Sequence, residues 1–365
     1  MYLLREILKS VSDYKEDIID ILKQNPATVL VYGAGLTAIA VAKHLQKNNI
    51  EITAFFVDNQ YYQSDMKIMD IPVLSIEDVF NNYDKFNTVI GFCPYDKAKK
   101  VMMSDKFTAK GKVLYWDQAE SFGWDFVNAH YQDFEDTFAL FNDQQSKEVF
   151  IAYMKARLTG YPDELIELCS KPQYFCNFVP LTDKEVLVDC GAYDGDTLLS
   201  FNNVTHSKYD RIYAFEPEPE NYSKLQEISK QLHDVILINK GAWKEKDTLH
   251  FEPYGAGSNI TEKGSLTVDV ISIDEVVKDD RVTMIKMDIE GSELCALQGA
   301  KNTIRRWLPK LAICVYHKKE DMITIPQYIQ SILGENQKYS FYLRHHSTLY
   351  NETVLYAIPD MNSNI

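Results

Sequence analysis

The pattern of apolar and polar residues divides the chain into two α/β series separated by a helical segment. In the first series, an apolar strand at 28–32 leads into a glycine turn, apolar residues at helical spacing and a second strand that ends at Asp58. This succession is typical of a βαβ unit. The alternation of strand and helix continues to about residue 117, which predicts a small doubly wound domain over 1–116.

A different pattern fills residues 117–180. Bulky apolar residues recur there three and four positions apart, without the β-branched alternation of strands, so we expect two or three amphipathic helices that link two domains. Apolar strands alternate with helical spacing again from residue 186 onward, which predicts a second domain over 181–365. The expected fold class is α/β, with two doubly wound Rossmann-like domains joined by a helical segment.

Composition limits the classes of partner. The chain has 365 residues, 45% of them hydrophobic, and a net charge of −15, so phosphate backbones and anionic lipids would be repelled and no nucleic acid is expected. No segment reaches the roughly 18 uncharged apolar residues that span a bilayer, and the first residues lack the apolar region of a signal peptide. We therefore expect a soluble, cytoplasmic protein without membrane insertion. Six cysteines without a C-x-x-C pair indicate reduced core thiols.

A glycine turn follows the strand that begins the second domain. Gly191 and Gly195 allow the backbone to turn tightly and to approach a ligand. Because the spacing after Asp189 is G-x-x-x-G and not G-x-G-x-x-G, it fits a loop for the amino-acid part of S-adenosylmethionine better than a pyrophosphate loop. The next strand ends at Glu216, a carboxylate of the kind that accepts both ribose hydroxyls. Together these features predict a nucleotide-like cofactor.

The stretch "IKMDIEGSE", residues 285–293, carries one lysine and three acids directly after an apolar run. Since ligands bind at the carboxyl ends of parallel strands, Asp288 is predicted to lie beside the cofactor, with Glu290 as second candidate. A carboxylate at such a position could accept a proton from a reacting group. Glu293 is expected to complement the dipole of the helix that it begins. Lys286 is either catalytic or an ion-pair partner of one of these acids.

Three histidines are further candidates. His317 follows the next strand, should lie at the same edge of the sheet, and is a second candidate for the general base. His345 and His346 point to opposite faces of a late strand and are expected to be mainly structural. Because histidines and acids are scattered over separate elements, no required metal is predicted.

The second half resembles FkbM-like methyltransferases. The shared segments, in order, are "VDCGAYDGDT", "AFEPEPENY", "NKGAW", "VISIDEV", "IKMDIEGSELCALQGA" and "LAICVYHKKEDMITIPQYI". The resemblance covers about 181–360 and implies a class I methyltransferase fold, S-adenosylmethionine as donor, and O-methylation of a hydroxyl on a sugar, glycan precursor or related small molecule, as in carbohydrate biosynthesis. It implies a cofactor site made of the first loop, the ribose ligand and the wall beside the adenine: Asp189, Gly191, Ala192 and Gly195; Glu216; Asn239, Ala242 and Trp243.

The first domain carries a second candidate nucleotide site. "GAGLTA", with Gly33 and Gly35, has the G-x-G-x-x-A spacing of a nucleotide-binding turn, and Asp58 stands where a ribose-binding acid is expected. Residues 55–79 resemble small Rossmann modules joined to sugar-modifying enzymes, so a nucleotide-sugar is a candidate ligand and a nicotinamide dinucleotide is the alternative. An empty scaffold or an oligomerisation module is also consistent, which leaves a homo-oligomer open.

Two other classes of function are alternatives. An NAD-dependent oxidoreductase or epimerase of nucleotide-sugars would use the first domain, but the Y-x-x-x-K spacing of Tyr95 and Lys99 follows the wrong strand and lacks a partner serine. A non-catalytic nucleotide-binding module is the other alternative, and the complete set of second-half motifs argues against it. The preferred function is an S-adenosylmethionine-dependent O-methyltransferase with a small-molecule or glycan acceptor.

Overall fold

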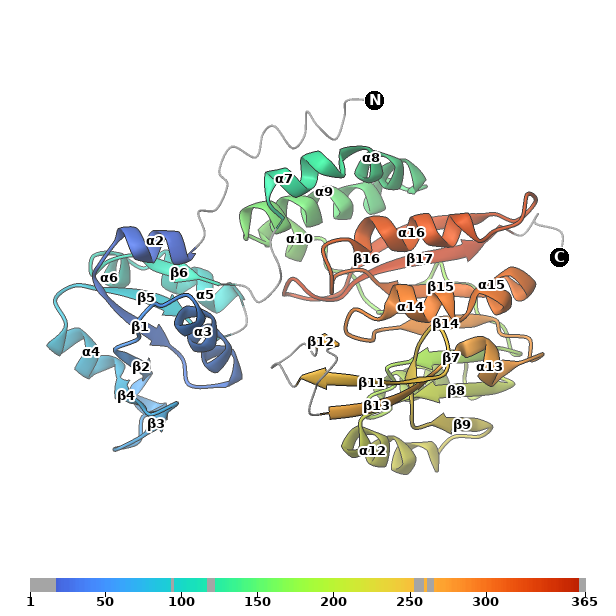
Figure 1. Cartoon of the computed structure of the whole chain (residues 1–365), viewed down its shortest axis with the longest axis horizontal. Helices are drawn as coiled ribbons and strands as arrows, with labels where there is room; N and C mark the ends of the chain where they lie inside the picture. Colours follow the sequence, from blue (N-terminus) through green and yellow to red (C-terminus); the bar gives the residue numbers. More distant parts are fainter. Residues whose placement is uncertain (1–17, 93–94, 117–121, 253–258, 261–265, 361–365) are drawn as a thin grey trace. The chain divides into compact units, whose positions relative to one another are not determined.

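The chain forms two compact units, each built around a mostly parallel sheet (Figure 1). The computed structural model describes residues 18–92, 95–116, 122–252, 259–260 and 266–360. One unit contains the described residues up to 116 together with 157–161, and the other contains 122–156 and everything described from 162 onward. The expected α/β class with two Rossmann-like sheets is confirmed. Part of the expected first helix and Cys93 lie outside the described residues.

The first unit has a six-stranded sheet in the order β3-β4-β2-β1-β5-β6, and all neighbours are parallel except β3 and β4. Its strands are β1 (Thr28–Tyr32), β2 (Ala54–Val57), β3 (Lys67–Ile68), β4 (Ile71–Ser75), β5 (Phe86–Ile90) and β6 (Val113–Tyr115). Its helices are α2 (Ile18–Gln24), α3 (Leu36–Lys47), η1 (Asn59–Tyr61), α4 (Ile76–Asn82), α5 (Tyr95–Met102) and α6 (Asp105–Thr108). The predicted strand, glycine turn, helix and strand are therefore present.

The second unit has a seven-stranded sheet in the order β16-β17-β15-β14-β7-β8-β9. Its strands are β7 (Val186–Cys190), β8 (Arg211–Phe215), β9 (Val235–Ile238), β14 (Met284–Met287), β15 (Lys310–Cys314), β16 (Tyr339–His345) and β17 (Thr353–Pro359). β17 is antiparallel to β15 and β16, and the remaining pairs are parallel. The chain runs outward from β7 through β8 and β9 and then returns to β14 on the other side. The topological switch point, where such sheets bind ligands, is thus between β7 and β14.

Buried apolar strands explain why this sheet forms. Every residue of β7, β14 and β15 is buried, and helices on both faces are typical of such two-sided burial. The helices that follow β7 are α11 (Asp196–Val204), α12 (Pro219–Ser229), α13 (Ile273–Val277), α14 (Glu293–Gln298), α15 (Lys301–Trp307) and α16 (Asp321–Ser331). The fold therefore presents the carboxyl ends of β7 and β14 side by side at one edge.

A four-stranded sheet, in the order β10-β13-β11-β12, was not predicted. Its strands are β10 (Gly241–Ala242), β11 (Asp247–Glu252), β12 (Asn259–Ile260) and β13 (Leu266–Ile271). Two of these strands have only two residues, and β11 begins within the charged run "KEKD". So short and polar a pattern carries too little periodicity to identify strands in advance.

The helices after residue 122 do not form a separate linker, which corrects the expectation for 117–180. They are α7 (Trp124–Ala129), α8 (Tyr131–Leu140), α9 (Gln144–Thr159) and α10 (Asp163–Glu167). Most of them belong to the second unit, where α8 lies against α16 (Figure 1). Gln327 donates to Asp133 at 3.1 Å, and Arg344 pairs with Asp143 at 2.6 Å. Periodicity showed that these helices had an apolar face but not what would cover it.

The described cysteines agree with the expectation of reduced thiols. The thiols of Cys169, Cys176, Cys190, Cys295 and Cys314 are free, and three of them are buried. Within the described ranges, no helix is both long and apolar enough to cross a membrane.

Candidate active site

The loop after β7 is held against the end of β14 by a glycine. Gly191 has φ +79°, and a Cβ at this position would lie 2.0 Å from the carbonyl oxygen of Asp288. Both the left-handed backbone and the close approach require glycine. Ala192 is buried, Gly195 ends the loop, and α11 begins at the next residue. The loop therefore brings the predicted cofactor turn and the acid-rich segment into direct contact.

Glu216 lies at the end of β8 beside this loop and is 5% exposed. One carboxylate oxygen accepts the backbone N–H of Tyr193 at 2.9 Å, and the other accepts that of Glu218 at 2.9 Å. Burial raises the pKa of Glu216, although these two hydrogen bonds oppose the shift. Each oxygen retains a second acceptor position, so the carboxylate can still accept hydroxyl groups.

Lys286 and Asp189 form a buried ion pair across the switch point. Their side chains are 3% and 0% exposed, Nζ lies 3.0 Å from Oδ1, and Nζ also donates to the carbonyl oxygen of Gly191 at 2.9 Å. Burial raises the pKa of Asp189 to about 6 in spite of the lysine. Burial alone would lower the pKa of Lys286, but the charges of Asp189 and Asp288 raise it, so the lysine stays protonated. This pair fixes the first loop to β14.

The position of Lys286 corrects the sequence expectation. Its partner is not one of the acids of 285–293 but Asp189 on the neighbouring strand. The register explains this, because Lys286 stands directly opposite Asp189 in the parallel pair β7 and β14. With its hydrogen bonds directed into the protein, Lys286 positions the site and is not placed to meet a substrate.

Asp288 lies just past the end of β14 and accepts two phenol groups. Tyr316 donates to Oδ1 at 3.0 Å, and Tyr174 donates to Oδ2 at 3.0 Å. Burial, together with the nearby acids, raises the pKa of both tyrosines far above the ordinary value, so both remain protonated donors. The carboxylate is thereby held in a fixed orientation at the carboxyl end of β14.

His317 contacts three carboxylates. Nδ1 lies 2.9 Å from Oε1 of Glu293, and Nε2 lies 3.4 Å from Oδ1 of Asp288 and 3.7 Å from Oε2 of Glu290. Burial opposes protonation, but the hydrogen bond and charge of Glu293 and the charges of the other two acids raise the pKa of His317 to about 9. The imidazole is therefore cationic at neutral pH and has no free position to accept a proton.

Glu293 lies in the first turn of its helix, as the sequence predicted, but it is buried. It begins α14, but its side chain is 0% exposed, and it accepts the backbone N–H of Ile289 at 2.8 Å. One ligand atom each from Asp288, Glu293 and His317 lies within 4.8 Å of the others. Contrary to the sequence expectation, separate elements do not keep metal-ligating groups apart here, because the carboxyl ends of β14 and β15 meet at one edge.

Sequence reasoning missed three residues of this cluster. Tyr174 precedes the sheet, Tyr316 follows β15, and Glu352 precedes β17. Glu352 accepts hydrogen bonds from Gln173 and from Tyr316. Only the position of Tyr316, one residue before His317, gave a usable signal. The other two arrive from distant segments through the antiparallel strand β17 and the turn around residue 174.

The three residues predicted to line an adenine pocket lie in the segment that follows β9. Asn239 donates to the carbonyl oxygens of Glu216 and Pro217 at 2.9 and 3.3 Å. Ala242 lies in β10, and the carbonyl oxygen of Trp243 packs against Gly299. Their assignment to an adenine pocket stays a prediction.

His345 and His346 are buried in the protein interior, 0% and 1% exposed. Nδ1 of His345 lies 2.9 Å from Oγ1 of Thr353, while His346 contacts the carbonyl oxygen of Ser170 and the hydroxyl of Tyr356. Burial lowers the pKa of both histidines to about 4. Each is neutral at physiological pH and is held by structural partners.

The candidate site of the first unit has the expected backbone. Gly33 has φ +130°, and a Cβ there would lie 2.5 Å from the carbonyl oxygen of Gly91. Gly35 precedes α3, and a Cβ at this position would have no atom within 4 Å. Asp58 follows β2 and accepts the hydroxyl of Tyr32 at 2.6 Å. The turn is formed, and its outer side is open.

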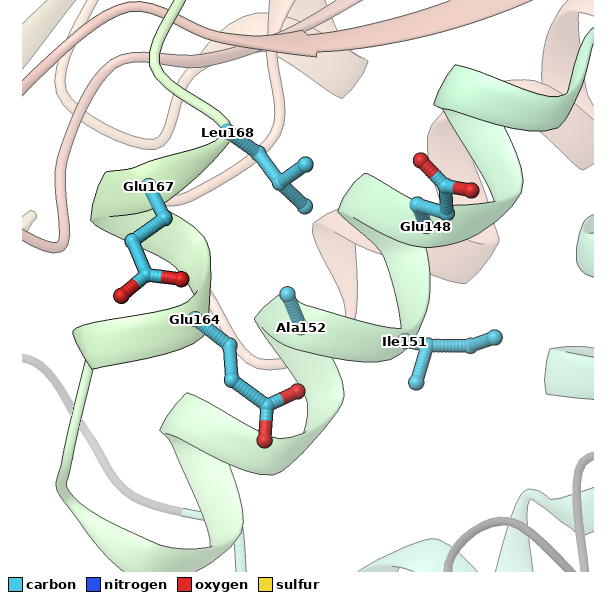
Figure 2. A pocket seen from close by; sticks show the side chains of 6 residues that line it. All are labelled: Glu148, Ile151, Ala152, Glu164, Glu167 and Leu168. Atoms are coloured by element: carbon cyan, nitrogen blue, oxygen red, sulfur yellow. The ribbon is translucent and has the colours of Figure 1, made fainter.

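A separate cavity of about 270 Å³ lies between α9 and α10 (Figure 2). Its lining residues are Glu148, Ile151, Ala152, Glu164, Glu167 and Leu168. Figure 2 shows Ala152 and Leu168 between the three glutamates, and Glu164 is already paired with Lys155 at 2.7 Å. None of the predicted site residues lines this cavity, so it is distinct from the cluster around Asp288.

Comparison with known proteins decides the chemistry of the second unit. Residues 189–341 match the family model described as the methyltransferase FkbM domain. These residues form an FkbM methyltransferase domain. The chain is therefore an S-adenosylmethionine-dependent methyltransferase, as the resemblance implied. No curated protein matches the sequence.

Solved structures agree on the fold. The methyltransferase FkbM from Methylobacillus flagellatus KT is similar over 97% of this chain and 98% of that chain, with 23% identity and a TM-score of 0.76. This likeness shows a class I methyltransferase fold. An rRNA methylase from Streptococcus thermophilus has 13% identity over 50% of this chain and 90% of its own, with a TM-score of 0.33. A likeness at that level supports no inference about this chain.

The residues present fit S-adenosylmethionine. The loop from Gly191 to Gly195 leads directly into α11, whose positive end favours a carboxylate such as that of the donor. Glu216 offers acceptor positions for ribose hydroxyls, and Asp288 supplies negative charge at the crevice edge. Asp189 is turned inward onto Lys286, so it supports the loop from behind and does not offer a free carboxylate to the ligand.

Proposed function

We propose that the FkbM methyltransferase domain methylates a hydroxyl group of a sugar, a glycan precursor or a related small molecule. The observation that carries this proposal is the placement of Asp288, an acid at the carboxyl end of β14 that touches the first cofactor loop. A hydroxyl acceptor must lose its proton as it is methylated, and a fixed carboxylate at this position can take it. The choice of a sugar-like acceptor rests on the family resemblance, which is an argument by analogy.

The residues around Asp288 have different proposed roles. S-adenosylmethionine, when bound, supplies the electrophilic methyl group. Tyr174 and Tyr316 orient Asp288, and alignment of the acceptor oxygen with the methyl group contributes most of the rate enhancement. Asp288 accepts the proton of the hydroxyl. His317, whose Nε2 lies 3.4 Å from Oδ1 of Asp288, offsets part of the negative charge of the surrounding acids.

The contacts of the two candidates favour Asp288 over His317 as the base. Replacing Asp288 by Asn preserves shape but removes the proton acceptor, so turnover should fall by about 10²–10⁴. Transfer of a labelled methyl group to a panel of sugars, nucleotide-sugars and simple hydroxy compounds provides the assay. Asp280→Asn is the matched control, because Asp280 pairs with Arg211 and not with any residue of the crevice. Near-normal turnover of Asp288→Asn, with loss of turnover in His317→Ala, would assign the base to His317.

We propose further that the first unit binds a nucleotide-sugar and so helps to capture the substrate. The support is the open turn between Gly33 and Gly35 at the amino end of α3, where a helix favours phosphate groups. Gly35→Asp places a negative charge in open space without a steric clash, so it should abolish nucleotide-sugar binding by the full chain and leave the fold intact. Unchanged binding of nucleotide-sugars, or none in the native chain, would make this unit a scaffold or a contact for oligomers.

A further inference from the structure

The three acids around His317 leave a buried polar atom without a protein partner. Among the residues that the structure describes, Oε2 of Glu293 has no hydrogen-bond donor, although the side chain is 0% exposed. Oε1 of the same carboxylate already accepts Ile289 and faces His317. A buried carboxylate oxygen is costly when unpaired, so Oε2 marks a position where a bound ion would supply the missing interaction.

The local charge is also unbalanced. Asp288, Glu290 and Glu293 carry three negative charges, and His317 supplies at most one positive charge. Lys286 cannot compensate them fully, because it is committed to Asp189 and Gly191. A dication placed among these groups would remove the excess charge.

The distances suit a coordination shell. One ligand atom each from Asp288, Glu293 and His317 lies within 4.8 Å of the other two, and Nε2 of His317 is 3.4 Å from Oδ1 of Asp288. Ligand atoms bound at about 2.0–2.2 Å from a common ion are roughly 3–3.5 Å apart. Glu290 is 63% exposed and lies 3.7 Å from Nε2, so it can turn inward as a fourth ligand.

We propose that Asp288, Glu293 and His317 bind a divalent metal ion of the Mn²⁺ or Zn²⁺ type, and that the imidazole gives up one proton as the ion binds. Mixed carboxylate and imidazole ligands favour these ions over Ca²⁺, which takes oxygen ligands only. A second set of candidate ligands, Asp288, Cys314 and Glu352, shares one residue with this site. We favour the first set because it contains the unpaired Glu293 oxygen, whereas Glu352 already accepts Gln173 and Tyr316.

The ion would lie beside the acid to which we assign the proton transfer. A hydroxyl oxygen bound to a divalent ion has a much lower pKa, which would ease its deprotonation before methyl transfer. This role rests on the proposed function, whereas the binding site itself does not.

Metal binding can be measured without donor or acceptor. The untagged full chain, stripped with a chelator, is titrated with Mn²⁺ while the signal of the free ion is followed by electron paramagnetic resonance, and with Zn²⁺ by calorimetry. We expect one ion per chain, and we expect Glu293→Gln and His317→Asn each to weaken binding by at least about 10-fold. Glu352→Gln is the matched control, since it removes a nearby charge that is not among the proposed ligands, and should change affinity less than about 3-fold.

Two results would overturn the proposal. One is the absence of stoichiometric binding of either ion to the native chain at millimolar concentration. The other is a loss in Glu352→Gln as large as in the two site variants, which would indicate general attraction or the alternative ligand set. Thermal unfolding verifies that each variant is folded, and if Glu293→Gln is not, His317→Asn decides the question. The metal titration contains no methyl acceptor, so a negative result would reject the metal site without rejecting the proposed methylation, which the methyl-transfer assay tests.

Discussion

The ion pair of Lys286 and Asp189 gives the sharpest prediction about how the site is held together. Replacing Lys286 by Met keeps the length of the side chain but leaves the carboxylate of Asp189 buried, 0% exposed and without its partner 3.0 Å away. Removing one member of a buried pair costs about 3–5 kcal/mol, because the other charge stays desolvated. We expect Lys286→Met to lower the free energy of unfolding by this amount.

The matched control is a surface pair of the same chemistry. Lys230 and Glu227 lie 2.7 Å apart, but their side chains are 67% and 72% exposed. Lys230→Met should therefore change the free energy of unfolding by less than about 1 kcal/mol. Urea unfolding of the full chain, followed by fluorescence, measures both variants under the same conditions.

A second variant separates the lost charge from the lost packing. In Lys286→Met combined with Asp189→Asn, no unpaired charge remains, so most of the stability should return. If Lys286→Met costs no more than Lys230→Met, or the double variant is no more stable than Lys286→Met alone, the pair does not hold the loop to β14.

Three further predictions concern packing and pH. Gly191→Ala should unfold at a lower denaturant concentration and bind S-adenosylmethionine at least about 10-fold more weakly, because the new methyl group would lie 2.0 Å from the carbonyl oxygen of Asp288. Calorimetry measures this affinity, and a value equal to that of the wild type would contradict the prediction. Lys310→Met should lower the free energy of unfolding, measured with urea, by about 3–5 kcal/mol, because it leaves the buried Glu185 without its partner. A decrease of less than about 1 kcal/mol would be inconsistent with a buried pair. Burial lowers the pKa of His346 to about 4 in the folded protein. As pH falls below about 6.5, the histidine is therefore protonated in the unfolded state before it is protonated in the folded state. The stability that the neutral, buried histidine contributes is present above about pH 6.5 and is lost as pH falls toward 4. Stability should drop by about 2 kcal/mol between about pH 7 and pH 5 on account of this residue, and His346→Asn should remove that part of the slope.

Local sequence patterns predicted most strands of the two large sheets well, because buried parallel strands produce apolar runs. Gly191, Glu216 and Asp288 lie where those patterns placed them. The partner of Lys286 could not be predicted, since it depends on the register between β7 and β14.

Residues that join the site from distant segments were also beyond the sequence. Tyr174 reaches Asp288 across 114 positions of the chain, and no periodicity connects the two. The depth of burial of Glu293 was missed because an acid at the start of a helix is usually solvated. These features arise from tertiary packing, which single-sequence patterns do not record.

Calorimetric titration of the full chain with S-adenosylmethionine, its demethylated product and NAD tests the predicted cofactor site. We expect the first two to bind, and we expect Glu216→Ala to weaken both by about 10–100-fold through loss of charged hydrogen bonds to the ribose. Any binding of NAD should be unchanged in this variant. If S-adenosylmethionine does not bind, or binds with the same affinity when Glu216 is replaced, the cofactor site described at the ends of β7 and β8 is wrong.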